Sequence, residues 1–419
     1  MKRGKPNDGG LPERSARSGF DTWVFRLIAA LSLAGMLGLI ALLVPQYPYD
    51  AGDWQLRCRE LQVLRSGIDP FDVFSRRVQV PGYVSLLDAV PGQSAVHYYP
   101  PWTYGFCIWA AWLGDVEAQK CAAGAGNAAA LLALVWMMFL CARRRTGRID
   151  QAAAVTVLAL LLDIFPLYRT FEVGNFSIVA AAAGFAMILL LERKHDMWAG
   201  WMLALLMLKI QIGFVFVVPL VIGRRWRTLA VGGILCFLAA CIPAWFTGKS
   251  PVLLGWQLLY SGDPSFLSPY SGGLFSVFAR QLSASVLMAA NAAVSIGGLI
   301  WVSWRLRFQR DWLWKLLPAA AVVPLWSYSQ AIDLCLLLIP LVYFLVMFVR
   351  DGMRPSDVLS PLLFSVGLGH ALWNVFVLSG RLCRPDGIGW IFIGYLTVCY
   401  FGWLGVLYWT TRRADEHGA

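Results

Sequence analysis

Charge is what this sequence most conspicuously lacks. Only 14% of its 419 residues are charged, whereas 58% are hydrophobic, and the mean hydropathy is +0.62. A typical soluble domain has about 25% charged residues, so a soluble globular protein is excluded. Histidine is also scarce, at 4 residues, and the nine cysteines form no CxxC pair. Neither a zinc site nor a disulfide framework is therefore indicated.

Long apolar runs are what the sequence has instead. They recur from Trp23 to Tyr408, with lengths near or above the roughly 20 residues that cross a bilayer as a helix. The pattern predicts an all-α, polytopic helical membrane protein with about 12 transmembrane helices. We expect the following divisions: residues 1–20 a disordered cytoplasmic arm, residues 21–412 a single transmembrane domain, residues 45–116 within it a first extracytoplasmic loop, and residues 413–419 a cytoplasmic tail.

The net charge of +11 is explained by the ends of these runs rather than by nucleic acid. Lys and Arg gather at the ends of predicted spans, as expected of cytoplasmic loops. The basic arm places the N-terminus inside, so the first loop lies outside. Basic span ends alternate with the other loops along the chain, and this alternation leaves the C-terminus inside. We therefore expect a multi-pass protein of the cell (inner) membrane.

One segment, Tyr98–Leu113, conflicts with a simple alternation. As a full span it would leave Arg143–Arg145 outside, against the positive-inside rule. We predict instead a partial helix at the outer surface, begun by Pro100-Pro101. Spans then follow near residues 117–141, 149–167 and 176–191, with an outer loop that carries Arg169, Glu172, Gly174 and Asn175.

Residues 198–222 predict a short helical hairpin with Lys209 at its tip. The segment must begin and end inside, because Arg224 and Arg225 follow it, and it is too short for two full spans. A lysine at such depth is costly unless it faces a cavity or a partner, so Lys209 is a candidate functional residue.

The unusual polar residues all fall on the predicted outer side. They are Asp50, Asp53, Asp69, His97, Arg169, Glu172, Lys209, Arg280 and Asp333. An active site open to lipid at this face needs a carboxylate beside the reacting centre and a cation for a lipid phosphate. Glycosyl transfer from a polyprenyl-phosphate sugar requires both, because the acceptor hydroxyl loses a proton while the leaving phosphate gains charge.

Each of these residues also has a structural interpretation. Asp53 could be the N-cap of a loop helix rather than a base. Lys209 could snorkel from a helix end, and Arg169 with Glu172 could form an i,i+3 ion pair. Asp333 either caps a span or lines the cavity. His97 is one aromatic residue among several near a predicted membrane interface, so a structural role is favoured over a functional one.

Scattered motifs resemble glycosyltransferase family 87 (the DUF2029 group) of the GT-C superfamily. The matching pieces are Asp53 with Gly67 and Asp69-Pro70-Phe71-Asp72; Tyr98-Tyr99-Pro100-Pro101; Pro166, Arg169 and Gly174-Asn175; Ala199-Gly200 through Lys209 to Arg224-Arg225-Trp226; and Ser327-Tyr328, Asp333 and Pro340. Three positions depart from the family pattern. Asn175 replaces a Gln, Ile210 replaces a Pro, and Ser329-Gln330-Ala331 stands where mannosyltransferase branches carry a Trp-Asp-His-His-like segment.

The resemblance implies a GT-C fold, a polyprenyl-phosphate-linked sugar donor and an inverting single displacement onto a lipid or glycan acceptor. It implies Asp53 as the catalytic base, with Asp50 the runner-up. The sugars that it suggests are mannose and arabinofuranose, for a mannosyltransferase or pentosyltransferase of the cell envelope. Donor-phosphate or substrate contacts are expected from Arg169, Lys209, Asn175, Tyr99, His97, Arg280, Asp333 and Gln330.

Two other functions remain open at the level of sequence. A transporter or flippase of a lipid-linked or small anionic solute should show internal repeats and ionisable groups along a whole path, whereas here they concentrate at one face. A ligase or polymerase that uses diphosphate-linked glycans would share the outer-face chemistry. We expect no cofactor, no required metal and no nucleic-acid partner.

Overall fold

A computed structural model of the chain describes residues 51–74, 99–260, 284–326 and 331–351, together with three isolated positions near the N-terminus. Every regular element within these ranges is helical, as the sequence predicts. The α-helices are α2 (Gly52–Arg65), α3 (Pro70–Phe74), α5 (Pro101–Cys107), α6 (Val116–Thr146), α7 (Ile149–Leu162), α8 (Ile164–Val173), α9 (Ser177–Glu192), α10 (Asp196–Leu206), α11 (Ile210–Ile222), α12 (Trp226–Thr247), α13 (Pro251–Tyr260), α14 (Ala284–Arg305), α15 (Trp312–Trp326) and α16 (Leu338–Asp351), and the 3₁₀ helices are η1 (Ile108–Trp112) and η4 (Ala331–Leu337).

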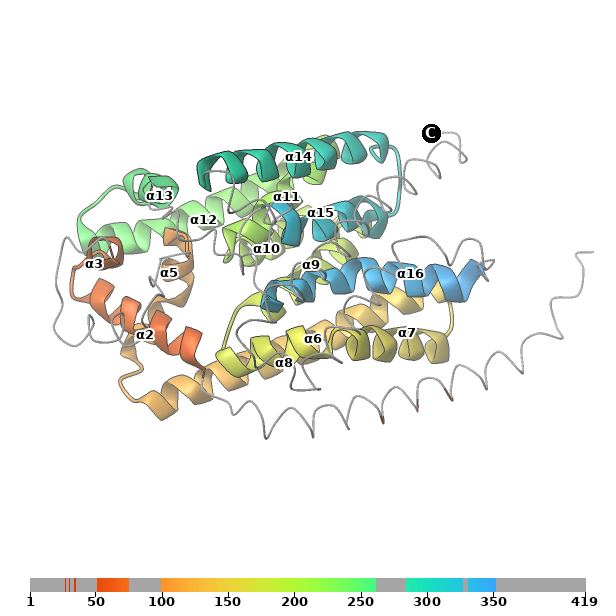
Figure 1. The fold of residues 1–419 in the computed structure, drawn as a ribbon, viewed down its shortest axis with the longest axis horizontal. Coiled ribbons are helices and arrows are strands. Elements are labelled where there is room, and N and C mark those ends of the chain that lie inside the picture. Colours follow the sequence, from red (N-terminus) through yellow and green to blue (C-terminus); the bar gives the residue numbers. More distant parts are fainter. Residues whose placement is uncertain are drawn as a thin grey trace, which may run out of the picture.

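The helices are arranged along one long axis (Figure 1). The short helices α2, α3, α5 and α13 gather at one end, whereas α6 runs along the length of the molecule beside α7 and α9. The main apolar core lies between α6, α7, α9, α11, α15 and α16, and a smaller core joins α2 and α5 to Ala123 of α6. The end built by α2 and α5 therefore has its own hydrophobic support.

Two helices in the described ranges, α6 and α12, are long and apolar enough to cross a membrane. The first begins where the Asp115 carboxylate accepts the Ala118 N–H, and it ends at Gly147, whose φ of +71° is one that glycine adopts readily. Shorter apolar helices, among them α9 and α11, pack beside these two. The predicted total of about 12 spans remains a prediction.

The predicted span at residues 149–167 is wrong in one respect, because the helix breaks at Asp163. Helices α7 and α8 meet there at 68°. Pro166 lies in the first turn of α8, where its ring would collide with a continuous helix and its missing N–H leaves no bond to residue 162. Arg169 and Glu172 consequently lie on α8 rather than in the outer loop that we expected.

The partial helix predicted over Tyr98–Leu113 is confirmed as a short element. Helix α5 and the 3₁₀ helix η1 together extend only from Pro101 to Trp112, too few residues to cross a bilayer. Helix α5 packs tightly on α12, since a methyl group added at Gly105 would lie 1.9 Å from the carbonyl oxygen of Ala239. Only glycine permits this approach.

The hairpin predicted around Lys209 is also confirmed. Helix α10 ends at Leu206, helix α11 begins at Ile210, and Lys209 lies in the turn between them. The 11 residues of α10 span about 16 Å at ~1.5 Å per residue, roughly half the thickness of a bilayer core. Lys209 therefore lies at the tip of a short helical hairpin.

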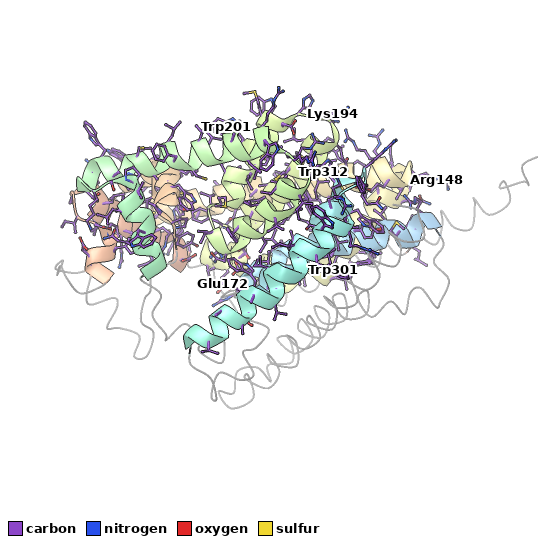
Figure 2. All side chains as sticks on the ribbon, turned by 90° about the horizontal axis from the view of Figure 1, so that it is seen from above. Arg148, Glu172, Lys194, Trp201, Trp301 and Trp312 are labelled. Atoms are coloured by element: carbon purple, nitrogen blue, oxygen red, sulfur yellow. The ribbon has the colours of Figure 1, made fainter. Side chains whose placement is uncertain are left out.

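Basic residues gather at the end of the bundle away from α2. Arg145 is 22 positions beyond Ala123 on α6, about 33 Å along the helix axis. Its guanidinium bonds Glu192 at the end of α9 and Asp311 before α15, the latter at 2.6 Å. Figure 2 places Arg148 toward one end of the long axis and Glu172 well away from it.

Several predictions concern residues outside the described ranges. They are the cytoplasmic arm and tail, most of the first span near residues 23–44, the spans beyond residue 351, and the candidate residues Asp50, His97, Arg280 and Gln330.

Candidate active site

Asp53 lies in the first turn of α2, and a backbone contact fixes the start of that helix. Ala51 adopts φ 52° and ψ 30°, a left-handed conformation that is uncommon outside glycine. Its N–H donates to the carbonyl oxygen of Glu172, at 2.9 Å, near the end of α8. Ala51, not Asp53, occupies the N-cap position, so the alternative interpretation of Asp53 as an N-cap is wrong.

Gly174 allows α2 to approach the turn between α8 and α9. It has φ +71°, and a Cβ added there would lie 2.8 Å from Cβ of Trp54 and 3.4 Å from Cβ of Ala123. Any larger residue would meet both a backbone strain and a steric clash. Because Gly174 has no side chain, α2 packs close enough to this turn for Asn175 to reach Asp53.

The Asp53 carboxylate receives two hydrogen bonds on one oxygen. Its Oδ2 accepts from the Tyr99 hydroxyl at 3.0 Å and from Nδ2 of Asn175 at 2.6 Å. Tyr99 and Asn175 are buried, whereas the side chain of Asp53 is 25% exposed. Burial, and then the Asp53 charge, raise the pKa of the Tyr99 phenol well above its usual value. The phenol therefore stays protonated and acts as a donor.

A buried ion pair lies behind this carboxylate on the same face of α2. Asp53, Arg57 and Glu60 are spaced i, i+4 and i+7, so that they align along one side of the helix. The Arg57 guanidinium lies 2.5 Å from Glu60 Oε2 and 3.9 Å from Asp53 Oδ1, and it stacks over the Tyr99 ring at 4.7 Å. Arg57 is thus bonded more closely to Glu60 than to Asp53.

Tyr104 of α5 completes the surroundings of Glu60. Its hydroxyl donates to Glu60 Oε2 at 3.0 Å. Burial raises the pKa of Glu60 to about 8, opposed by the positive charge of Arg57 and reinforced by the negative charge of Asp53. Glu60 is therefore a buried carboxyl group whose pKa lies well above its ordinary range.

Lys209 forms a second buried ion pair, with Asp333 of η4. Lys209 Nζ lies 2.5 Å from Asp333 Oδ1, and their side chains are 5% and 0% exposed. The same ammonium donates to the Ser177 hydroxyl at 3.1 Å. Since Lys209 is buried against a partner, the alternative interpretation that it snorkels is wrong.

Helix α5 holds the Lys209 turn in place from the side. The Trp102 indole N–H donates to the carbonyl of Met207 at 2.7 Å, and the Thr103 hydroxyl donates to the carbonyl of Leu208 at 2.8 Å. These bonds satisfy two carbonyls that the end of α10 leaves without helical partners. The Tyr99–Thr103 segment therefore contacts both Asp53 and the turn of Lys209.

Ser177 connects the two halves of the site. It begins α9, and its N–H and hydroxyl lie 3.1 and 2.9 Å from Oδ1 of Asn175. Its hydroxyl also lies 2.9 Å from Asp333 Oδ1. A continuous series of contacts thus runs through Asp53, Asn175, Ser177, Asp333 and Lys209.

Another charged cluster tethers the loop after α2. Lys249, which follows α12, forms ion pairs with Asp69 and with Asp72, the latter at 2.7 Å. The two carboxylates raise the pKa of Lys249 although burial opposes the shift. This cluster joins α3 to the start of α13, and it accounts for the charge of Asp69 without a catalytic role.

The structure thus brings together five of the residues predicted for the site. They are Asp53, Tyr99, Asn175, Lys209 and Asp333. Arg169 instead donates to Glu172 on its own helix, which confirms the i,i+3 ion pair. Asp50, His97, Arg280 and Gln330 lie outside the described residues.

Sequence reasoning missed three residues of the site: Arg57, Glu60 and Ser177. The i, i+4, i+7 spacing of charges after Asp53 could have revealed the first two. Ser177 gave no signal, because its partner Asp333 is 156 residues away.

The arrangement favours proton abstraction by a carboxylate. The two donors that point at Oδ2 fix the orientation of the Asp53 carboxylate. The carboxylate is the most exposed of the five groups that the structure brings together, so an acceptor hydroxyl can reach it.

Comparison with known protein families gives one match. The family described as glycosyltransferase family 87 matches residues 97–328, more than half of the chain. This range includes Tyr99, Asn175, Ser177 and Lys209. No curated protein and no solved structure matches the chain significantly.

Proposed function

This chain belongs to glycosyltransferase family 87, and from that membership we propose an integral membrane enzyme that takes a sugar from a polyprenyl-phosphate donor. The acceptor is a lipid or glycan at the extracytoplasmic face, and the sugar is mannose or arabinofuranose. The family match supports a glycosyltransferase and offers no support for the transporter or flippase.

The geometry of Asp53 carries the proposal. In an inverting displacement, the acceptor oxygen bonds the anomeric carbon while the bond from that carbon to the phosphate oxygen breaks. The acceptor proton passes to Asp53, and polyprenyl phosphate leaves with the electron pair. A partly exposed carboxylate, held by Tyr99 and Asn175, suits the acceptance of that proton.

The placement at the extracytoplasmic face is supported by the distribution of charge. Helices α9 and α11 end close to the basic groups Arg193-Lys194 and Arg224-Arg225. The Asp53 region lies about 33 Å away from Arg145 along α6, close to the thickness of a hydrocarbon core. With basic groups on the cytoplasmic side, this distance supports the proposal that Asp53 lies at the opposite face, and the charge alternation along the sequence supports both termini inside.

The depth of the site supports a lipid-linked donor. A sugar attached to polyprenyl phosphate presents its anomeric carbon at the membrane surface, while the prenyl chain remains in the apolar layer. Trp109 and Trp112 of η1 are about half exposed beside this end, as is typical of residues at a membrane interface.

Sugar transfer in isolated membranes tests the proposal. Wild type, Asp53→Asn and Asp50→Asn are compared with polyprenyl-phosphate mannose and polyprenyl-phosphate arabinofuranose as donors. We expect product from one donor, a loss of at least about 10²-fold for Asp53→Asn, and transfer close to wild type for Asp50→Asn. Equal activity of wild type and a well-expressed Asp53→Asn would exclude Asp53 as the base. Consumption of neither donor by folded wild type would exclude both proposed sugars.

A further inference from the structure

The two oxygens of Asp53 have different surroundings. Oδ2 accepts hydrogen bonds from Tyr99 and Asn175, whereas Oδ1 has Arg57 Nε at 3.9 Å, beyond hydrogen-bond distance. Among the described residues, no hydrogen bond reaches Oδ1. Oδ1 is therefore the oxygen left available to accept a proton, and the groups on Oδ2 set its direction.

The amide of Asn175 can face Asp53 in one orientation only. Its Oδ1 accepts from the Ser177 N–H at 3.1 Å, a fixed backbone donor two residues further along the chain. With the oxygen held there, the NH₂ group must point the other way, toward Asp53. An amide turned by 180° would place its oxygen against the carboxylate and its NH₂ against the Ser177 N–H.

The hydroxyl of Ser177 links the Asn175 amide to the Lys209–Asp333 ion pair. A hydroxyl has one proton to donate and can also accept. Lys209 donates to the Ser177 oxygen, so the single proton is left for Asn175 Oδ1 or Asp333 Oδ1, each at 2.9 Å. Ser177 is fully buried, and no competing water is needed to explain its bonding.

We propose that Asn175 and Ser177 are positioning residues for the base, and that the Lys209–Asp333 pair is the charged anchor that holds them. This inference rests on the proposed function, and it assigns Asn175 and Lys209 to the support of Asp53 rather than to the donor phosphate. Asn175 turns Asp53 so that Oδ1 faces the acceptor, and Ser177 keeps Asn175 in its active orientation.

The first test is a set of pH–rate profiles with saturating donor. We expect Asn175→Ala to lower kcat by about 10- to 100-fold, because a hydrogen bond to a charged group is lost. The acidic limb should move to higher pH, since the remaining carboxylate is protonated more easily. The KM for the donor should change less than twofold. Ser177→Ala should shift the profile in the same direction by less, because its N–H still holds Asn175.

Two further variants sharpen this test. Asn175→Gln keeps both the donor and the acceptor, so we expect it to recover part of the lost kcat. Asn127→Ala removes another buried amide, on α6, and should leave the acidic limb unchanged. If Asn175→Ala raises the donor KM and leaves the acidic limb in place, Asn175 binds donor and the positioning role is wrong.

A second measurement does not depend on activity. Thermal unfolding of the purified protein is compared for Asp53→Asn, Asn175→Ala and the double variant. A direct contact makes the two changes non-additive, whereas independent sites give additive shifts. Additive shifts would overturn the inference even if no donor is turned over. Inactive wild type with non-additive shifts would overturn the proposed function alone.

Discussion

The two ends of the bundle both contain charged residues, but they arrange them differently. At the basic end, Arg145 is surrounded by the carboxylates of Glu192 and Asp311, so each charge meets an opposite one directly. At the other end, Asp53 is held mainly by neutral donors, Tyr99 and Asn175. A charge neutralised by an ion pair stabilises helix packing, whereas a charge held by neutral donors keeps its capacity to accept a proton.

The largest expected difference between the two ends is in catalysis. Asp53→Asn should reduce sugar transfer by about 10³-fold, within the range for loss of a general base. Asp311→Asn, the matched change at the basic end, should leave transfer per folded protein unchanged. Both variants are measured in the same membranes after normalisation to the folded fraction. A comparable loss in both would mean that the two ends do not differ in this way.

The next effect concerns the anchor inside the site. Lys209→Met leaves the Asp333 carboxylate buried without its cation, which should lower the free energy of unfolding by about 3 kcal/mol. The double variant Lys209→Met/Asp333→Asn should recover more than half of that loss. Thermal unfolding in detergent reports both changes. If the double variant is as unstable as the single one, the pair is not what stabilises this region.

A smaller stability change is expected at the basic end. Arg145→Gln removes hydrogen bonds to two carboxylates and should lower the free energy of unfolding by about 2 kcal/mol. Arg145→Lys keeps the charge but not the paired geometry, so it should fall between wild type and Arg145→Gln. Transfer activity of the folded fraction should not change in either variant, and a loss of activity would contradict a purely structural role.

The last effect is a slope of stability with pH, and it comes from Glu60, whose pKa is raised to about 8 from an ordinary value of 4.5. The folded protein binds an extra proton between these values, so this stabilising contribution is full below pH 4.5 and disappears as the pH rises through about 8. Glu60→Gln cannot titrate and should flatten the fall in melting temperature between about pH 5 and 8. An unchanged slope in Glu60→Gln would show that another group causes it.

Features that depend on local spacing were predictable from the sequence. The hairpin around Lys209 followed from its length and from Arg224 and Arg225 after it, and the short helix after Pro101 followed from the charge alternation. The break at Asp163 was not predicted, although Pro166 was noted for its family resemblance. The effect of Pro166 on the apolar run from residue 149 was overlooked, because mean hydropathy does not reflect that proline lacks a backbone N–H.

The site was predictable only in part, for a physical reason. A buried lysine or an aspartate beside a span is unusual enough in an apolar chain to attract notice. The partners that define their roles are not. Ser177 is an ordinary residue, and its contact with Asp333 arises only when α9 and η4 pack together. Arg57 was missed, and its bond to Glu60 rather than to Asp53 depends on the rotamer that it adopts on α2.

The close contact at Gly105 has a mechanical consequence. Because the backbones of α5 and α12 touch at Ala239, neither helix can slide along the other without first separating, so they move as one piece. Tyr99, just before α5, is carried with that piece, whereas Asn175 is carried with α8 and α9. The two hydrogen bonds on Asp53 Oδ2 therefore come from different helices, and both form only when α5, α8 and α9 are packed together around α2.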